Sequence, residues 1–149
     1  MAVHDTATDK AVRYSDYHIE VPFLDHLDIL VEPDAAAPVL VVNLERKHMN
    51  GGGQAHGGLI MTLLDMAMAA AARKGDESGR AGVTVEMKTN FLRPGGTIGG
   101  RLSARGKLRH ASKSLAFCDG DLHDAQGQLV ATASGIFKFV SLRPSGDAP

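Results

Sequence analysis

Cysteine is almost absent from this chain of 149 residues, in which the single example is Cys118. An intrachain disulfide is therefore excluded, and the low cysteine content is compatible with a reducing compartment, so we expect a cytoplasmic protein. Clustered cysteines and histidines are missing from the sequence, and so is an HExxH motif. We therefore expect no metal site.

Long apolar segments and an excess of one charge are missing as well. The start of the chain, MAVHDTATDKAVRYSDY, lacks the apolar stretch of a signal peptide. The longest apolar run, Leu59–Ala72, is too short to span a bilayer and contains Asp65. The net charge is −1 and the pI about 6.6, which gives no electrostatic reason to expect nucleic acid or an anionic membrane as a partner.

The motifs of P-loop nucleotide sites, of serine triads and of cysteine nucleophiles are also absent. No GxxxxGK[ST] loop is present, which argues against a P-loop nucleotide site. No GxSxG is present either, and Cys118 has no recognisable nucleophile motif around it, so neither a serine triad nor a cysteine nucleophile is indicated.

What the chain does contain is an ordinary globular composition, with 44% apolar and 22% charged residues. Its length fits one domain with one core. We expect this domain over residues 13–142, between an N-terminal tail at 1–12 and a C-terminal tail at 143–149.

The apolar patterns predict one long helix among several strands, an α+β fold. A short helix is expected at Pro22–Ile29, and short strands at 27–33 and at Ala37–Arg46. The long helix is expected over Gly57–Lys74, because Arg73 and Lys74 suit its C-terminal end and Gly75 suits the next position. Val83–Leu92 alternates, which would place Val83, Val85, Met87, Thr89 and Phe91 on one face. Three further strands, at 97–110, 112–124 and 129–142, would complete a meander, with a hairpin turn at Asp124–Gln128.

The long helix carries one carboxylate in an apolar segment. Between Leu59 and Ala72 only Thr62 and Asp65 are polar, and their spacing of three residues places them on one face. Asp65 is either a structural acid, exposed at a seam or hydrogen-bonded to a neighbouring loop, or a general base or nucleophile at a buried seam.

A glycine-rich turn, GGGQAHGG, precedes this helix. Backbone N–H groups at a helix start favour a negatively charged oxygen, which would be a phosphate or the oxyanion of an acyl transfer. The alternative is a turn that is merely flexible. Gly57 and Asp65 are eight residues apart, which is about 12 Å along a helix. If both act on one reacting group, they must come from two copies of the chain, so a catalytic interpretation predicts a homodimer with sites at its interface.

The segments HMNGGGQAHGGLIMTLLDMAMAAAA, GVTVEMKTNFLRPG and DAQGQLVATASGIFKF resemble the hotdog-fold acyl-CoA thioesterases, specifically the phenylacetate-degradation subfamily. The resemblance extends from about Phe23 to Val140, and its most specific element is Asn50 followed by His56-Gly57-Gly58 and Asp65. It implies a long central helix wrapped by a curved antiparallel sheet. It also implies a homodimer formed edge to edge, often a homotetramer as a dimer of dimers.

The resemblance further implies catalytic roles for five residues. Asp65 would attack the thioester carbonyl or activate a water that does, and Gly57 of the partner subunit would polarise the thioester oxygen through its N–H group. His56 would orient the turn, and Asn50 would position water or the carboxylate. Thr84 would hold the attacking water. From the residues alone, Asn50 could instead cap the turn, Thr84 could be an ordinary strand residue, and His48 could be a surface loop residue.

The basic strand region from Arg101 to Lys113 has two interpretations. It is either a solvated face with edge-protecting lysines or a contact for the phosphates of coenzyme A. The resemblance favours the second interpretation for the hairpin, so the residues expected to bind substrate and CoA are Gly58, Arg109, His110, Ser112 and Lys113. Coenzyme A would be part of the substrate, and no other cofactor is expected.

These observations predict an acyl-CoA thioesterase that hydrolyses a small, aromatic or medium-chain acyl-CoA to free acid and CoA. A non-catalytic acyl-CoA binding module and a thioesterase for acyl carrier proteins are the alternatives. A hotdog dehydratase is a further alternative, but the HGG-to-Asp65 pattern does not supply the Asp/His pair which that chemistry requires.

Overall fold

The computed structural model of the chain describes residues 10–33 and 36–142. Its helices are α1 (Tyr14–Tyr17), α2 (Pro22–His26) and α3 (Gly57–Lys74), with a 3-10 helix, η2, at Arg46–His48. Its strands are β1 (Val12–Arg13), β2 (Leu30–Glu32), β3 (Val39–Asn43), β4 (Ala81–Phe91), β5 (Arg101–Ala111), β6 (Leu115–Asp124) and β7 (Leu129–Val140). The expected C-terminal tail and residues 1–9 of the expected N-terminal tail lie outside the described residues.

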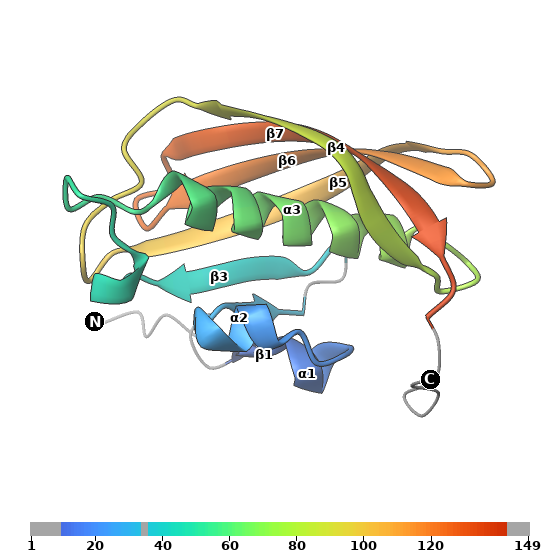
Figure 1. Cartoon of the computed structure of the whole chain (residues 1–149), viewed down its shortest axis with the longest axis horizontal. Coiled ribbons are helices and arrows are strands. Elements are labelled where there is room, and N and C mark those ends of the chain that lie inside the picture. Colours follow the sequence, from blue (N-terminus) through green and yellow to red (C-terminus); the bar gives the residue numbers. More distant parts are fainter. Residues whose placement is uncertain (1–9, 34–35, 143–149) are drawn as a thin grey trace, which may run out of the picture.

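All seven strands form one antiparallel sheet in the order β1-β2-β3-β5-β6-β7-β4. Figure 1 shows this sheet curving around α3, with α1 and α2 lying below the helix. The predicted α+β architecture, a long helix wrapped by a curved antiparallel sheet, is confirmed.

Helix α3 has the predicted bounds, because its sequence marks both ends. The His56 side chain caps the first turn, and Arg73 and Lys74 lie in the last turn before Gly75. The helix face toward the sheet is fully buried at Leu63 and Leu64. This face packs against buried strand residues to form one core, whose largest fully buried members include Leu40, Met68, Leu102, Leu122 and Phe137.

Helix and sheet come into close backbone contact at Gly106 of β5. A Cβ atom at this position would lie 2.2 Å from the carbonyl oxygen of Ala67 on α3. Glycine is therefore required there by close approach of the two backbones.

The last four strands do not form the predicted meander. β4 pairs with β7 at the edge of the sheet and not with β5, the next strand in sequence. The connection from β4 to β5 spans residues 92–100, which is too long for a tight hairpin. This connection runs past the start of α3 (Figure 1). β5, β6 and β7 do follow one another as predicted, and the Asp124–Gln128 turn is confirmed by the bond from Asp124 N–H to the Gln128 carbonyl.

The predicted alternation along β4 holds for Met87, Thr89 and Phe91 but is wrong for Val83 and Val85, because the strand contains a bulge. The register with β7 shifts between Thr84 and Glu86, so Val85 is an extra residue. Val83 therefore pairs with exposed Lys138, whereas Met87 pairs with buried Gly135, on the opposite face. The bulge turns Thr84 toward α3, and it leaves Val83 51% and Val85 60% exposed.

Candidate active site

Asp65 is half-buried near the middle of α3, beside the edge strand β4. The Thr84 hydroxyl donates a hydrogen bond of 2.6 Å to Oδ1 of Asp65. Burial raises the pKa of the Asp65 carboxyl, and the Thr84 hydrogen bond opposes this shift. Thr84 was predicted to hold the attacking water, and the structure places its hydroxyl directly on the carboxylate. A carboxyl group with a raised pKa and a fixed neighbour is typical of functional sites.

His56 and Gly57 form the start of α3. Nδ1 of His56 accepts a hydrogen bond of 2.8 Å from the Gly58 N–H, which uses the Gly58 donor. The Gly57 N–H, by contrast, has no acceptor within the described ranges 10–33 and 36–142. It is one of the helix N–H groups that lack an intrahelical partner, so it is available to a ligand oxygen.

Asn50 stabilises the glycine turn itself. Its side-chain oxygen accepts hydrogen bonds from the N–H groups of Gly52, at 2.9 Å, and Gln54, at 3.1 Å. The turn is held from the other side by Gly96, whose N–H donates to the Gln54 side chain and whose carbonyl accepts from Ala55. The turn is therefore held by hydrogen bonds on both sides. The contacts of Asn50 agree with the alternative interpretation, in which this residue caps the turn.

His48 is buried, with 2% exposure, which corrects its interpretation as a surface loop residue. Nδ1 accepts a hydrogen bond of 2.9 Å from the Glu45 N–H, and Nε2 donates one of 2.7 Å to the Leu27 carbonyl. The ring thus joins η2 to the end of α2. Lys47 and Met49 on either side of His48 do not predict this burial, which follows from the tertiary contact with Leu27.

Helix geometry keeps Gly57 and Asp65 apart, because eight residues correspond to about 12 Å along α3. The structure therefore brings Thr84 to Asp65, and His56 to Gly58, within one chain. It does not bring the Gly57 N–H to Asp65 within that chain.

The residues expected to bind CoA lie in two places. Gly58 belongs to the first turn of α3, while the other four lie on the exposed β5–β6 hairpin. Arg109 pairs with Asp119 at 2.6 Å, and the His110 ring lies 6.0 Å from that of Phe117. Ser112 accepts the Leu115 N–H and so shapes the turn.

Arg101, at the start of this basic region, has a structural role. Arg101 pairs with Glu32 and donates a hydrogen bond to the Asn43 side chain, which joins β5 to β2 and β3. These contacts fit the interpretation of a solvated, ion-paired strand face for Arg101.

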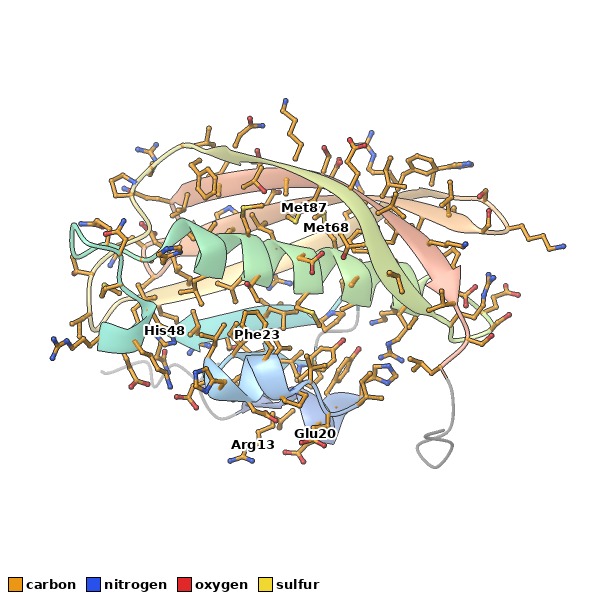
Figure 2. All side chains as sticks on the ribbon, in the orientation of Figure 1. Arg13, Glu20, Phe23, His48, Met68 and Met87 are labelled. Atoms are coloured by element: carbon orange, nitrogen blue, oxygen red, sulfur yellow. The ribbon has the colours of Figure 1, made fainter. Side chains whose placement is uncertain are left out.

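Sequence reasoning missed α2 as a neighbour of the helix start. A cavity of about 300 Å³ lies between them, lined by Phe23 and Leu27 on one side and by Leu59 on the other. Phe23 and His48 both lie below the N-terminal half of α3 in Figure 2. The PFLDHL segment signals a short amphipathic helix, but its position against α3 depends on the fold.

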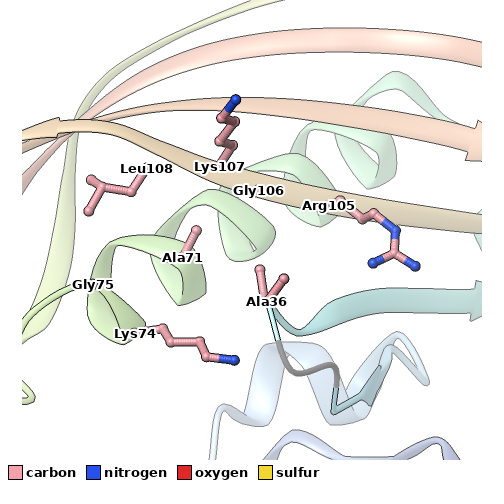
Figure 3. A pocket seen from close by; sticks show the side chains of 9 residues that line it. Ala36, Ala71, Lys74, Gly75, Arg105, Gly106, Lys107 and Leu108 are labelled. Carbon is pink, nitrogen blue, oxygen red and sulfur yellow. The ribbon is translucent and has the colours of Figure 1, made fainter.

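A wider hollow, of about 670 Å³, lies at the other end of α3 and contains none of the predicted site residues. Figure 3 shows its small residues, Ala71 and Gly106, and the Arg105 and Lys107 side chains diverging from β5. It adjoins the helix C-terminus, where the dipole disfavours an anion.

Neither a metal-binding cluster nor an activated thiol is found in the described part of the chain. Among the residues that the structure describes, no group of three or more His, Cys, Asp or Glu side chains could hold a metal ion. Cys118 is buried, and burial raises its thiol pKa to about 11, so the thiol stays protonated. No helix in the described part of the chain is long and apolar enough to cross a membrane.

Comparison with known proteins fits this geometry. The model of the thioesterase superfamily matches residues 52–131, which include all of the glycine turn except Gly51, the whole of α3, and Thr84. Mouse acyl-coenzyme A thioesterase 13 is 32% identical over 116 residues, covering 75% of this chain and 81% of that protein. The acyl-coenzyme A thioesterase PaaI of Escherichia coli is 29% identical over 119 residues, covering 80% of this chain and 82% of PaaI.

Solved structures agree in fold. E. coli PaaI, from the phenylacetic acid degradation operon, superposes with a TM-score of 0.75 at 25% identity, covering 87% of this chain and 91% of that one. A Bacillus halodurans protein solved with CoA superposes with a TM-score of 0.76 at 22% identity, covering 87% of this chain and 86% of that one, and shows the fold alone. The chain therefore belongs to the thioesterase superfamily and is a thioester hydrolase of the hotdog fold.

Proposed function

We propose that this thioester hydrolase acts on acyl-CoA, releasing the free acid and CoA, with Asp65 as its general base or nucleophile. The observation that carries the proposal is the half-buried Asp65 carboxylate, which accepts a hydrogen bond from Thr84 and lies on a partly exposed face of α3. Relatives named acyl-coenzyme A thioesterases support CoA as the thiol carrier.

The chemistry needs only a base and an oxyanion donor. In the general-base route, Asp65 takes a proton from water, and the oxygen of that water attacks the thioester carbonyl carbon. The carbonyl oxygen becomes an oxyanion that accepts a hydrogen bond from the Gly57 N–H. The carbon–sulfur bond then breaks, and the CoA thiolate leaves and takes up the proton. In the nucleophilic route Asp65 itself attacks, and water hydrolyses the resulting anhydride.

Gly57 and Asp65 are about 12 Å apart along α3, too far for both to meet one carbonyl within a chain, so the Gly57 N–H would come from the partner subunit. Two features support this arrangement. The outer edge of β4 pairs with no strand of the described chain, and its Val83 and Val85 are more than half exposed. The face of α3 that carries Asp65 also leaves Met61 36% exposed. Paired edges of this kind would bury both apolar surfaces.

Recognition of CoA by Arg109, His110, Ser112 and Lys113 remains part of the proposal. The hairpin is exposed, as a surface that meets a phosphate must be. A dimer of dimers also stays a prediction.

The test is thiol release from short, medium, long and aromatic acyl-CoA esters, with Asp65→Asn measured beside the wild type. We expect kcat/KM to fall by about 10²–10⁴ in the variant, the range of a lost general base. Unchanged circular dichroism and elution volume serve as the control for folding and assembly. Equal kcat/KM for the two proteins would refute the role of Asp65, and absence of turnover on every CoA ester would refute CoA as the carrier.

A further inference from the structure

The tip of the β5–β6 hairpin, residues 112–114, is held in place from outside the hairpin. The Lys113 carbonyl accepts a hydrogen bond of 3.0 Å from Nη1 of Arg80, and the Ser114 carbonyl accepts one of 2.9 Å from the Phe139 N–H. Arg80 comes directly before β4, and Phe139 lies near the end of β7. The position of the tip therefore depends on residues that belong to neither of the strands it connects.

The Arg80 side chain is itself fixed by its neighbours. Nε and Nη2 donate hydrogen bonds of 3.2 and 3.0 Å to the two carboxylate oxygens of Asp76, and the Arg80 N–H donates one of 2.7 Å to Oδ2. The guanidinium carbon lies 4.6 Å from the centre of the Phe139 ring. Because the donors of a guanidinium form a rigid planar fork, Arg80 can hold the Asp76 carboxylate and the Lys113 carbonyl at the same time.

The tip that Arg80 holds carries two of the residues expected to bind CoA. Ser112 and Lys113 are both exposed on it. A lysine on an unrestrained loop loses conformational freedom when it binds a phosphate, and this loss weakens binding. A backbone that is already fixed at Lys113 reduces the loss, because the side chain starts from the right place before the substrate arrives.

We propose that Arg80 is a positioning residue of the CoA site, which fixes the hairpin tip so that Lys113 meets the phosphates of CoA. The proposal rests on the proposed function and adds to it a residue outside the hairpin. Among the described residues, Arg80 bonds to Asp76 and Lys113 and not to Asp65, so it acts through the hairpin and not on the reacting carbonyl. Loss of Arg80 should therefore weaken binding of the CoA moiety and spare the chemical step.

The experiment compares the wild type with Arg80→Met, which keeps an unbranched stem and removes the guanidinium. The substrates are the best acyl-CoA ester and the N-acetylcysteamine thioester of the same acyl group, which has the same reacting carbonyl and no phosphates. For the CoA ester we expect KM to rise by about 3- to 10-fold, the effect of ordering one long side chain on binding, with kcat within about twofold of the wild type. For the N-acetylcysteamine thioester, kcat/KM should stay within about twofold.

Arg80→Lys keeps the charge and loses the planar fork, so it should also raise the KM of the CoA ester. It replaces Arg80→Met in the comparison if the methionine variant does not fold. Titration of CoA alone by calorimetry gives the same comparison without turnover, and the Kd of CoA should rise by the same factor as KM.

Arg101→Met is the matched control. Arg101 is also an ion-paired arginine, with 26% of its side chain exposed against 29% for Arg80, and it lies at the opposite end of β5 from the tip. This variant loses the bonds to Glu32 and Asn43 and should leave KM, kcat and the Kd of CoA unchanged.

An unchanged KM and an unchanged Kd of CoA in Arg80→Met would overturn the proposal. Equal losses on the two thioesters would also overturn it, because a purely structural role would affect both alike. A wild type that binds no CoA would leave nothing for the tip to position and would overturn it as well. Thiol release by the wild type reports separately on the proposed function, so the two failures are distinguishable.

Discussion

At the scale of single residues, the Asp65–Thr84 pair decides at which pH the proposed base is ionised. Burial raises the pKa of Asp65, and the Thr84 hydrogen bond lowers it. Thr84→Val removes the hydroxyl and keeps the shape, so the pKa should rise further. Because only the ionised carboxylate acts as base, the acid limb of kcat/KM should move to higher pH.

The measurement is the pH profile of kcat/KM with the best acyl-CoA ester. Thr84→Ser keeps the hydroxyl and should leave the acid limb close to that of the wild type. A limb that stays in place or moves to lower pH in Thr84→Val would show that the hydroxyl does not stabilise the carboxylate.

His48 is buried and His56 is exposed, so replacing each histidine by alanine should change stability by different amounts. His48→Ala would leave the Glu45 N–H and the Leu27 carbonyl without partners in a buried site. We expect it to lower the free energy of unfolding by about 2–4 kcal/mol. His56→Ala removes an exposed N-cap contact with Gly58 and should cost only about 1 kcal/mol.

Denaturant unfolding of both variants checks this difference. Equal losses of stability would contradict it, because they would mean that the buried ring contributes no more than the exposed cap.

At the scale of elements, the sequence predicts what local signals encode. α3 shows both of its ends through His56 and Gly75, and the Asp124–Gln128 turn follows from its own residues. β1 and α1 were not predicted, because two extended residues and one helical turn carry no periodicity. The expected strand from 37 to 46 shortens to Val39–Asn43 because the chain turns into η2.

Some residues of the candidate site could likewise be predicted from local sequence, and others could not. Asp65 and Gly57 stand out as a lone acid and a glycine-rich helix start, so both could be found from the sequence. The direction of Thr84 could not, because the bulge at Val85 is defined only by the register of β4 against β7. The burial of His48 and the cavity between α2 and α3 likewise depend on contacts between residues far apart in the chain.

The contact of α3 with β5 should be intolerant of any added side chain. Gly106→Ala would place a Cβ atom 2.2 Å from the Ala67 carbonyl oxygen, so helix and strand must separate. We expect a loss of about 1–3 kcal/mol in the free energy of unfolding. Gly51→Ala, where no atom lies within 4 Å of the added Cβ, should stay within about 0.5 kcal/mol of the wild type. Denaturant titration decides, and equal stability of the two variants would show that the close approach is not needed.

At the scale of the whole molecule, one chain holds only half of each proposed site. If the β4 edges pair, Asp65 and the Gly57 N–H of one subunit belong to two different sites, both shared with the same partner, because a C2 interface brings the same surface of both subunits together. Such a dimer contains two sites, each with Asp65 from one subunit and Gly57 from the other. A same-chain site would need neither the dimer nor the exposed apolar edge.

Two inactive variants can separate these arrangements. Asp65→Asn removes the carboxylate, and Gly57→Pro removes the N–H at the first position of α3, where helices tolerate proline. Each homodimer should be inactive. If the site is shared, a heterodimer of the two variants has one site built from intact Asp65 and intact Gly57, and a second site that lacks both. Random exchange of subunits makes about half of the dimers mixed, so activity should return to about a quarter of the wild-type value. Mixing without denaturation and refolding is the control for exchange. A mixture that stays inactive although light scattering and tagged co-purification show mixed dimers would refute a site built from Asp65 of one subunit and the Gly57 N–H of the other.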